Sequence, residues 1–229
     1  MNSIYSTNVH MLFKRETEAT EPRRTEILEA ALRIVAAGGP DAITFRRVAE
    51  RAGVPLGSLT YYFESREDLL REAFRLYLAQ AIAFVRDVEE GSRPHTPSQI
   101  IEMVMAIMRR EFSDDPAMVR VEYELILYAV REPELAREFN AYERWMETKL
   151  AASLEETGAP RPIDAARTII DVARGFEIER LTHAGARLED LQRRLSLIVE
   201  ALINESPPAS RNLSRLPARK AARRRRSAP

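Results

Sequence analysis

The side chains that could catalyse a reaction or bind a metal are scattered through this sequence. The three histidines, His10, His95 and His183, have no carboxylate or cysteine cluster beside them at the spacing of metal ligands. Gly38-Gly39 lacks the pattern of a phosphate-binding loop, and Gly57-Ser58 lacks the pattern of a nucleophile elbow. The chain has no cysteine, which excludes disulfides and thiolate metal sites and favours a reducing cytoplasm. The sequence therefore predicts no catalytic centre, no metal and no cofactor.

One segment has a pattern that is typical of DNA binding. Residues 44–63 read TFRRVAERAGVPLGSLTYYF, which predicts two short helices with a glycine, Gly53, at the turn between them. Thr44 is placed to cap the first helix, and the small Ala49 allows the second helix to cross close to it. A tight turn of this kind sets the second helix into a DNA major groove, although many helical hairpins with this pattern only pack on a core. The residues expected to build the core of this motif are Val48, Ala49, Ala52, Val54, Leu59, Tyr61 and Phe63.

Helical periodicity extends along most of the chain. It predicts four helices before a Pro-rich linker at 91–97 and five after it, near 23–38, 45–52, 56–62, 65–89, 98–112, 116–130, 133–156, 163–184 and 188–204. No segment alternates with period two for long enough to demand a strand, so the predicted fold class is all-α. No apolar run approaches the roughly 18 residues of a membrane span. The expected organisation is a disordered arm at 1–20, a three-helix helix-turn-helix domain at 21–68, a second helical domain at 69–204 and a disordered basic tail at 205–229.

The net charge of zero conceals an uneven distribution of charge. The segment from Arg211 to Arg226 contains 8 basic residues and no acidic ones, so the rest of the chain has 27 basic residues against 35 acidic ones. The overall charge therefore gives no hint of nucleic-acid binding. The arginines at 223–226 suit either nonspecific contact with DNA phosphates or a passive solubilising tail, and the sequence favours neither.

Beyond these local patterns, the chain resembles a known family. Residues 44–70, TFRRVAERAGVPLGSLTYYFESREDLL, closely resemble the DNA-binding domain of TetR-family (tetracycline-repressor-like) regulators. The resemblance is specific over about residues 25–74. It covers the remainder only as architecture, because a helical ligand-binding and dimerisation domain of this length is expected there.

The resemblance implies which residues face DNA. By position they are Thr44, Arg46, Leu56, Gly57, Ser58, Thr60, Tyr62 and Arg66, with residues 56–58 toward the base edges and the others near phosphates or neighbouring bases. Guanidinium and phenol groups hold phosphates, and short side chains let a helix approach the bases. The sequence departs from the family at Pro55, where a small polar cap is common, and at Thr60, where an aromatic residue is common. These departures leave the operator sequence open.

The last two predicted helices have apolar stripes that suit either an internal core or a dimer. Leucine and isoleucine recur at spacings of 3, 4, 3 and 4 in the final helix, which is the pattern of a helical seam. The resemblance favours a homodimer, because a single recognition helix reads few bases. The residues expected at the interface are Ile169, Ile170, Ala173, Leu188, Leu191, Leu195, Ile198 and Leu202.

The middle helices are expected to enclose an effector pocket, lined by methionines and aromatic residues that adapt to a ligand. The candidates are Met103, Ile107, Met108, Tyr123, Leu127, Tyr128, Trp145, Phe176 and Glu177, most of which suit an ordinary core equally well. Four glutamates would favour a cationic ligand if buried, although surface exposure suits most of them better. They are Glu122, Glu124, Glu177 and Glu179.

By resemblance, the protein is expected to be a dimeric repressor in the cytoplasm, associated with the nucleoid and released from DNA by a small molecule. The long helix after Ser65 would transmit the change from the pocket to the DNA-binding helices. The expected partners are double-stranded DNA with a near-palindromic site, an unknown effector and a second copy of the chain, but no membrane. An activator, a regulator without a ligand, and a helical binding or interaction protein remain as alternatives.

Overall fold

The computed structural model describes residues 22–90, 94, 96–114, 116–183 and 185–204. Within these residues the chain forms nine α-helices, one short 3-10 helix and no strand, which confirms the predicted all-α class. The elements are α2 (Pro22–Gly38), η1 (Pro40–Ala42), α3 (Phe45–Ala52), α4 (Leu56–Tyr62), α5 (Arg66–Glu90), α6 (Pro97–Asp114), α7 (Pro116–Ala129), α8 (Pro133–Glu156), α9 (Pro162–Thr182) and α10 (Leu188–Ile203). The predicted arm at 1–20 and tail at 205–229, with His10 and His95, lie outside the described residues.

Local sequence explains where many of these helices begin. Five of them start at a proline, whose fixed φ suits a first turn and whose missing N–H would have no partner there. They are α2, α6, α7, α8 and α9. At the start of α5 the backbone N–H of Asp68 donates to Ser65 Oγ at 3.0 Å, and the Asp68 carboxylate accepts from the N–H of Glu64 at 3.1 Å. These bonds satisfy amide groups that a helix start would otherwise leave free.

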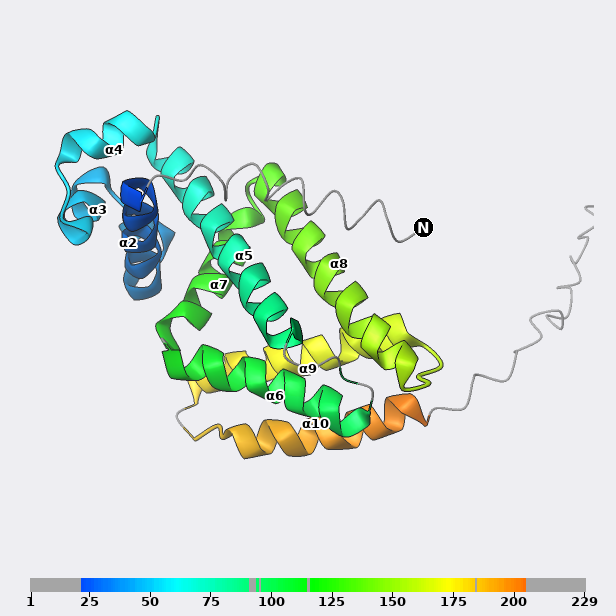
Figure 1. Ribbon diagram of the computed structural model, residues 1–229. Helices are drawn as coiled ribbons and strands as arrows, with labels where there is room; N and C mark the ends of the chain where they lie inside the picture. The colour runs from blue at the N-terminus through cyan, green and yellow to red at the C-terminus, as the bar shows by residue number, and fades with distance from the viewer. Residues whose placement is uncertain (1–21, 91–93, 95, 115, 184, 205–229) are drawn as a thin grey trace, which may run out of the picture.

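The helices are arranged in two connected groups (Figure 1). The short helices α3 and α4 lie with α2 at one end of the molecule, and α5 leads from them toward the other end. The helices α6, α9 and α10 lie across that far end, where α10 packs on α6 and α9. The helix α8 packs against both α5 and α9, and α7 packs against α2. Thus α7 contacts α2, and α8 contacts α5, so two helices of the body contact the helices that carry α3 and α4.

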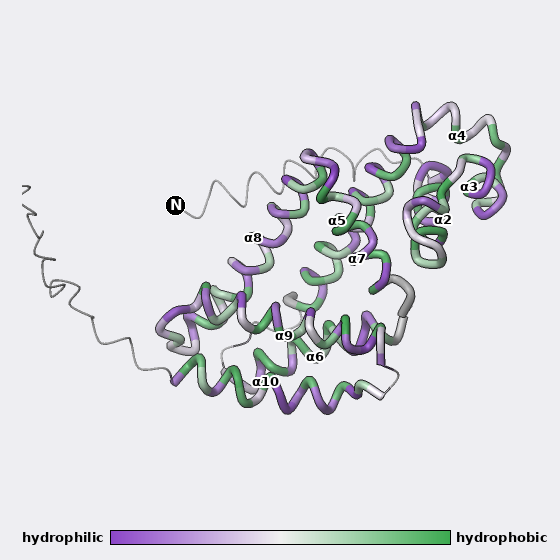
Figure 2. Tube along the Cα trace, turned by 180° about the vertical axis from the view of Figure 1, so that it is seen from behind, coloured by the Kyte–Doolittle hydropathy of each residue, from purple (hydrophilic) through white to green (hydrophobic). Residues whose placement is uncertain are grey.

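Two hydrophobic cores hold these groups together. The first is built on α2 and includes Leu28, Leu59 and Phe74, and it continues into α7 and α8 through Leu125 and Trp145. In Figure 2 α2 carries hydrophobic colour along much of its length, whereas α3 is largely hydrophilic. The second core lies between α6, α8, α9 and α10. Because the first core is continuous and close-packed, a shift of α7 or α8 would also displace the short helices at the end of the molecule.

Candidate DNA interface and ligand pocket

The turn between α3 and α4 has the geometry that its residues predict. Thr44 Oγ1 accepts a hydrogen bond from the backbone N–H of Arg47 at 3.2 Å and so caps α3. Gly53 ends α3 with φ 66°, in the left-handed region that glycine adopts at little cost. Val54 is buried directly after it, and Leu59 is buried on the inner face of α4. The turn thus holds α4 at a fixed angle with its other face turned outward.

The outward face of α4 corrects one expectation about the tyrosines. Tyr61 was expected in the core, but 80% of it is exposed, whereas Tyr62 packs partly against the core. Successive helical residues are about 100° apart, so Tyr62, three positions after Leu59, returns to its side while Tyr61 points away. The Tyr61 ring meets the Tyr62 ring edge-on, with centroids 5.0 Å apart. Tyr61 is therefore the phenol that this helix presents to solvent.

Several other residues expected to face DNA are accessible. Leu56 is half exposed. Beside it, Gly57 has no neighbouring atom within 4 Å of the position that a Cβ would occupy. The Thr60 hydroxyl donates to the Gly57 carbonyl at 3.0 Å, so it is turned back on its own helix. On α3, Arg46 is highly exposed and forms only a surface ion pair with Glu50, at 3.0 Å. Exposed pairs of this kind are weak, so a phosphate can replace the carboxylate.

Arg66 has a structural role that the sequence did not indicate. Its Nε donates to the carbonyl of Ile43 at 3.1 Å, and its Nη2 donates to the carbonyl of Pro40 at 2.8 Å. Its remaining contacts are with the carboxylates of Asp41 and Glu67, at 3.2 and 3.4 Å. The guanidinium therefore ties the start of α5 to the loop before α3. The phosphate contact expected of Arg66 stays a prediction.

Replacing Arg66 by methionine is expected to lower the free energy of unfolding by about 1–2 kcal/mol. The change removes hydrogen bonds to two backbone carbonyls but keeps the apolar stem of the side chain. Thermal unfolding followed by circular dichroism measures the effect. The control is Arg46→Met, whose exposed ion pair should contribute little. Equal unfolding temperatures for the two variants would show that Arg66 does not brace the motif.

An ion network connects α2, α5 and α8. Arg75 on α5 binds Glu138 on α8 through Nη2 at 2.8 Å and Nε at 3.1 Å. The same guanidinium binds Glu72 at 2.7 Å, and Glu72 also pairs with Arg24 on α2. Hydrogen bonds to the two carboxylates raise the pKa of Arg75 and keep it charged, and Glu138 is buried. The network thus fixes α8 to the helices that carry the α3–α4 motif.

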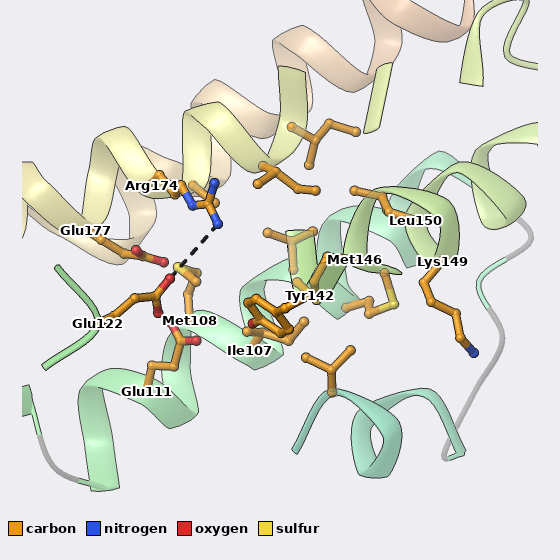
Figure 3. Close-up of a pocket in the computed structure, with 16 residues that line it drawn as sticks. Ile107, Met108, Glu111, Glu122, Tyr142, Met146, Lys149, Leu150, Arg174 and Glu177 are labelled. Carbon is orange, nitrogen blue, oxygen red and sulfur yellow. Dashed lines mark ion pairs between the residues drawn. The ribbon is translucent and has the colours of Figure 1, made fainter. Parts of the chain in front are cut away.

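A pocket lies between α5, α6, α7, α8 and α9 in the larger group of helices (Figure 3). Its cavity volume is about 90 Å³, which is below the usual range for small-molecule sites, so a ligand has to widen it. Its walls are mostly apolar. Four of the expected residues line it: Met103, Ile107, Met108 and Glu177.

The other expected pocket residues lie elsewhere. Tyr123 lies behind the wall, where its hydroxyl donates to Glu177 Oε2 at 2.6 Å. Trp145 and Phe176 are core residues, Tyr128 packs on the first core, and Leu127 is 67% exposed. In α7 the pocket side carries Glu122, so Leu127 and Tyr128, five and six positions later, turn away from it.

Sequence reasoning missed most of the polar lining. The pocket is also lined by Glu111, Glu122, Tyr142, Lys149 and Arg174 and by the apolar residues Val85, Val104, Met146, Leu150, Ile169, Ile170 and Ala173. Glutamates at helical spacing are usually solvated, so only the packing of five helices reveals that these ones face a cavity. Of the four glutamates that would favour a cation if buried, Glu122 and Glu177 line the pocket, whereas Glu124 lies beside Gly39 and Glu179 pairs with Arg194 on the surface.

Burial strongly affects the carboxyl groups of this pocket. It raises the pKa of Glu111 to about 9, helped by repulsion from Glu177 and Glu122. Burial likewise raises the pKa of Glu177 to about 7 and raises that of Glu122, in spite of hydrogen bonds from Tyr123 and from Tyr77. The pocket therefore contains carboxyl groups that are partly protonated near neutral pH.

Half of the residues expected at the dimer interface are covered by their own chain. Ile169, Ala173, Leu191 and Leu195 are buried within their own chain, where α10 packs on α6 and α9. Leu188, Ile198 and Leu202 are only partly exposed, and Ile170 lines the pocket. A 3-4 spacing marks a buried helical face but does not say which chain covers it. The large apolar residues that α9 and α10 expose are Ile163, Ile178, Leu181 and Leu197.

Two absences hold for the described part of the chain. It contains no helix of the length and apolar character needed to cross a membrane. It also brings no three potential ligands together in a way that would hold a metal ion.

Comparisons with known proteins agree with this arrangement. Residues 27–73 match the family model for bacterial regulatory proteins of the tetR family, and residues 95–205 match the tetracyclin repressor-like C-terminal domain. The transcriptional repressor KstR of Mycolicibacterium smegmatis is 30% identical, over 86% of this chain and 96% of its own length. The nicotine-responsive repressor HdnoR of Paenarthrobacter nicotinovorans is 24% identical, over 70% of this chain and 84% of its own.

Solved structures also resemble this chain over most of its length. The multidrug binding protein EbrR, in complex with ethidium, is 28% identical and superimposes with a TM-score of 0.59, covering 77% of this chain and 98% of that one. The relatives are transcriptional regulators, which confirms that the chain is not an enzyme. The α3–α4 motif, the helical body and these matches together place the chain in the TetR family of DNA-binding transcriptional regulators.

Proposed function

We propose that this protein is a dimeric repressor that leaves its operator when a small molecule enters the pocket between α5 and α9. Residues 21–68 would bind DNA, and residues 69–204 would hold the effector and form the dimer. The observation that carries the proposal is that α8 both lines the pocket, through Tyr142 and Met146, and binds Arg75 through Glu138, on the helix α5 that continues from the DNA-binding residues. A cytoplasmic location at the nucleoid follows from this role.

The proposed reading surface is the outward face of α3 and α4. Arg46 and Tyr61 offer a guanidinium and a phenol to phosphates, while Leu56, Gly57 and Ser58 present a low surface that can approach base edges. Leu56 suits a thymine methyl group, since it has no hydrogen-bonding atom. Thr44, Thr60, Tyr62 and Arg66 stay within the proposed interface, with Arg66 mainly as a brace.

Two paths link the pocket with this surface. The first is the ion network from Glu138 through Arg75 and Glu72 to Arg24. The second runs along α7, where Glu122 lines the pocket and Arg120 donates to the carbonyl of Ala36 in α2 at 3.3 Å. A ligand that prefers one arrangement of α7 and α8 would shift the population toward it and so change DNA affinity.

The relatives support the proposal that the effector is a small molecule. KstR is a repressor, HdnoR is nicotine-responsive and EbrR binds ethidium. Dimer formation is proposed through the outer faces of α9 and α10, because exposed apolar side chains there would be removed from water by a second copy. A symmetric dimer would read a near-palindromic operator with half-sites about 34 Å apart.

The double variant Arg46→Ala/Tyr61→Ala is expected to bind DNA from the region upstream of its own gene at least tenfold more weakly. Both side chains are exposed, so the fold should be retained and the unfolding temperature unchanged. Loss of one arginine contact should also reduce the salt slope by about 0.9. The measurement is a fluorescence anisotropy titration at several salt concentrations.

A matched control is Arg109→Ala, which removes an arginine with a surface ion pair on α6, outside the reading surface. It should bind DNA like the parent chain. Equal DNA affinity of the double variant and the parent at low salt would refute the proposed reading surface. Absence of any DNA binding by the parent chain would refute the proposed function itself.

A further inference from the structure

One end of the pocket has an excess of carboxyl groups over cations. Glu111 on α6, Glu122 on α7 and Glu177 on α9 converge there, as Figure 3 shows. The cation at this end, Arg174, forms a two-bond ion pair with Glu143 and lies 4.0 Å from Glu122. Its single charge is therefore divided between Glu143 and Glu122, which leaves this end with more carboxyl groups than cations.

The neighbours of these carboxyl groups are mainly phenols, which do not supply positive charge. Tyr77 donates to Glu122 at 2.6 Å, and Tyr123 donates to Glu177 at 2.6 Å. Among the described residues, no hydrogen bond or ion pair reaches the Glu111 carboxylate. The titratable groups around this end are Tyr77 on α5, Glu111 on α6, Glu122 and Tyr123 on α7, Tyr142 and Glu143 on α8, and Arg174 and Glu177 on α9.

The opposite end of the pocket is apolar and aromatic. Met146 of α8 lies there, Tyr142 lies beside Ile107 between the two ends, and Met103 also lines the pocket. Behind Tyr142 lies Trp145, stacked on it with ring centroids 6.3 Å apart. Lys149 lies on this side of the pocket, with its Nζ 6.0 Å from the Trp145 ring. A flat apolar body fits between methionine and aromatic side chains, and a cation beside Tyr142 gains from the ring face.

We propose that the effector of this pocket is an organic cation with an apolar, aromatic body. Its positive charge lies among Glu111, Glu122 and Glu177, and its body lies along Met103, Ile107 and Met146. The proposal rests on the proposed function, in which this pocket holds the effector. A neutral ligand would leave the carboxyl groups unused. An anion at this end would be repelled by them, because Arg174 is already paired with Glu143 and Glu122 and the other cation of the lining, Lys149, lies toward the opposite end.

The charge of the ligand affects the protonation of the carboxyl groups in the pocket. In the empty pocket the pKa of Glu111 is about 9 and that of Glu177 is about 7, so a proton occupies this end at neutral pH. A bound cation favours the ionised carboxylates and lowers both pKa values. Binding therefore releases protons, and the affinity for a cation rises as pH increases from about 7 to about 9 and becomes constant above that range.

The test uses three probes with the same aromatic body and different charge. They are 1-ethylquinolinium, its neutral isostere 1-ethylnaphthalene, and the anion 1-naphthylacetate. Binding is measured on the full chain without DNA through the fluorescence of Trp145, which is the only tryptophan in the sequence. We expect the dissociation constant of the cation to be at least tenfold lower than that of the neutral probe. Calorimetry in two buffers of different ionisation enthalpy counts the released protons.

The double variant Glu111→Gln/Glu177→Gln separates charge from shape, because glutamine has nearly the shape of a protonated glutamate. It should lose the preference for the cation, lose the proton release and keep its affinity for the neutral probe. The control is Glu102→Gln, which removes a carboxylate from the surface of the same helix, where it pairs with Arg109. This control should behave like the parent chain.

Three outcomes would overturn the proposal: equal or tighter binding of the neutral or anionic probe, a preference that survives in the double variant, or no binding of any probe up to about 1 mM. Operator binding by the ligand-free protein is measured in parallel. Normal operator binding with any of these outcomes rejects only the cationic ligand class. Loss of operator binding by the parent chain rejects the proposed function instead.

Discussion

Replacing Ile178 and Leu197 together by glutamate is expected to give a monomer that binds its operator at least a hundredfold more weakly than the parent chain. The two side chains are 49% and 73% exposed on α9 and α10. Burying them against a second copy would contribute roughly 25 cal/mol for each Å² of apolar surface removed from water, and four carboxylates in the same interface would repel each other. A monomer also loses the gain in affinity that comes from binding two half-sites at once.

Light scattering measures the first effect as a fall from twice the chain mass of 26.1 kDa to a single mass. A DNA titration at constant salt measures the second. Leu127→Glu is the matched control, because Leu127 is 67% exposed but lies on α7. It should remain dimeric and bind DNA normally. A parent chain that is monomeric at micromolar concentration, or a double variant that stays dimeric, would contradict the proposed interface.

Replacing Glu138 by alanine is expected to lower the free energy of unfolding by about 2 kcal/mol. The change leaves Arg75, a largely buried cation, without its closest carboxylate, although Glu72 and Glu134 still bind it. Removing one partner of a fully buried pair costs about 3–5 kcal/mol, and the remaining partners reduce this value. The unfolding temperature should fall by roughly 4–8 °C. Because Glu138 fixes α8 to α5, the variant should also lose most of the effect of a ligand on DNA affinity.

Glu134→Ala provides the comparison, since Glu134 binds the same guanidinium at 3.2 Å but is 59% exposed. Its effect on stability should be within about 0.5 kcal/mol. Differential scanning calorimetry and DNA titrations with and without ligand distinguish the two variants. A Glu138→Ala protein with normal stability and a normal ligand response would exclude the ion network as a path of communication.

The helices could be predicted from local sequence because their signals are local. Prolines mark first turns, Gly53 marks a left-handed turn, and Ser65 with Asp68 marks the start of α5. Residues near one another in the chain decide these features, so the predicted and observed bounds differ by only a few positions. The burial of Val54, Leu59 and Phe63 also follows from the short motif alone.

The errors arose where the answer depends on distant parts of the chain. Leu191 and Leu195 show a buried face, but only the fold shows that α6 and α9 of the same chain cover it. Glu111 lies far in sequence from Glu177, and nothing in the sequence brings them to one cavity. The prediction for Tyr61 was wrong for a local reason. Tyr61 lies about 200° around the helix from the buried Leu59 and therefore faces solvent, whereas Tyr62 lies close to the Leu59 side.

The continuity of α5 sets the scale of motion that repression requires. With 25 residues and a rise of 1.5 Å each, this helix is about 37 Å long, and it joins the pocket end of the molecule to the α3–α4 end. It acts as a lever arm, so a tilt of about 5° at one end moves the other by roughly 3 Å. In the proposed two-fold dimer the displacement would double across the two half-sites. In the proposed mechanism, a ligand that widened the pocket by less than the diameter of one atom would therefore move α4 of both copies out of register with the grooves of DNA.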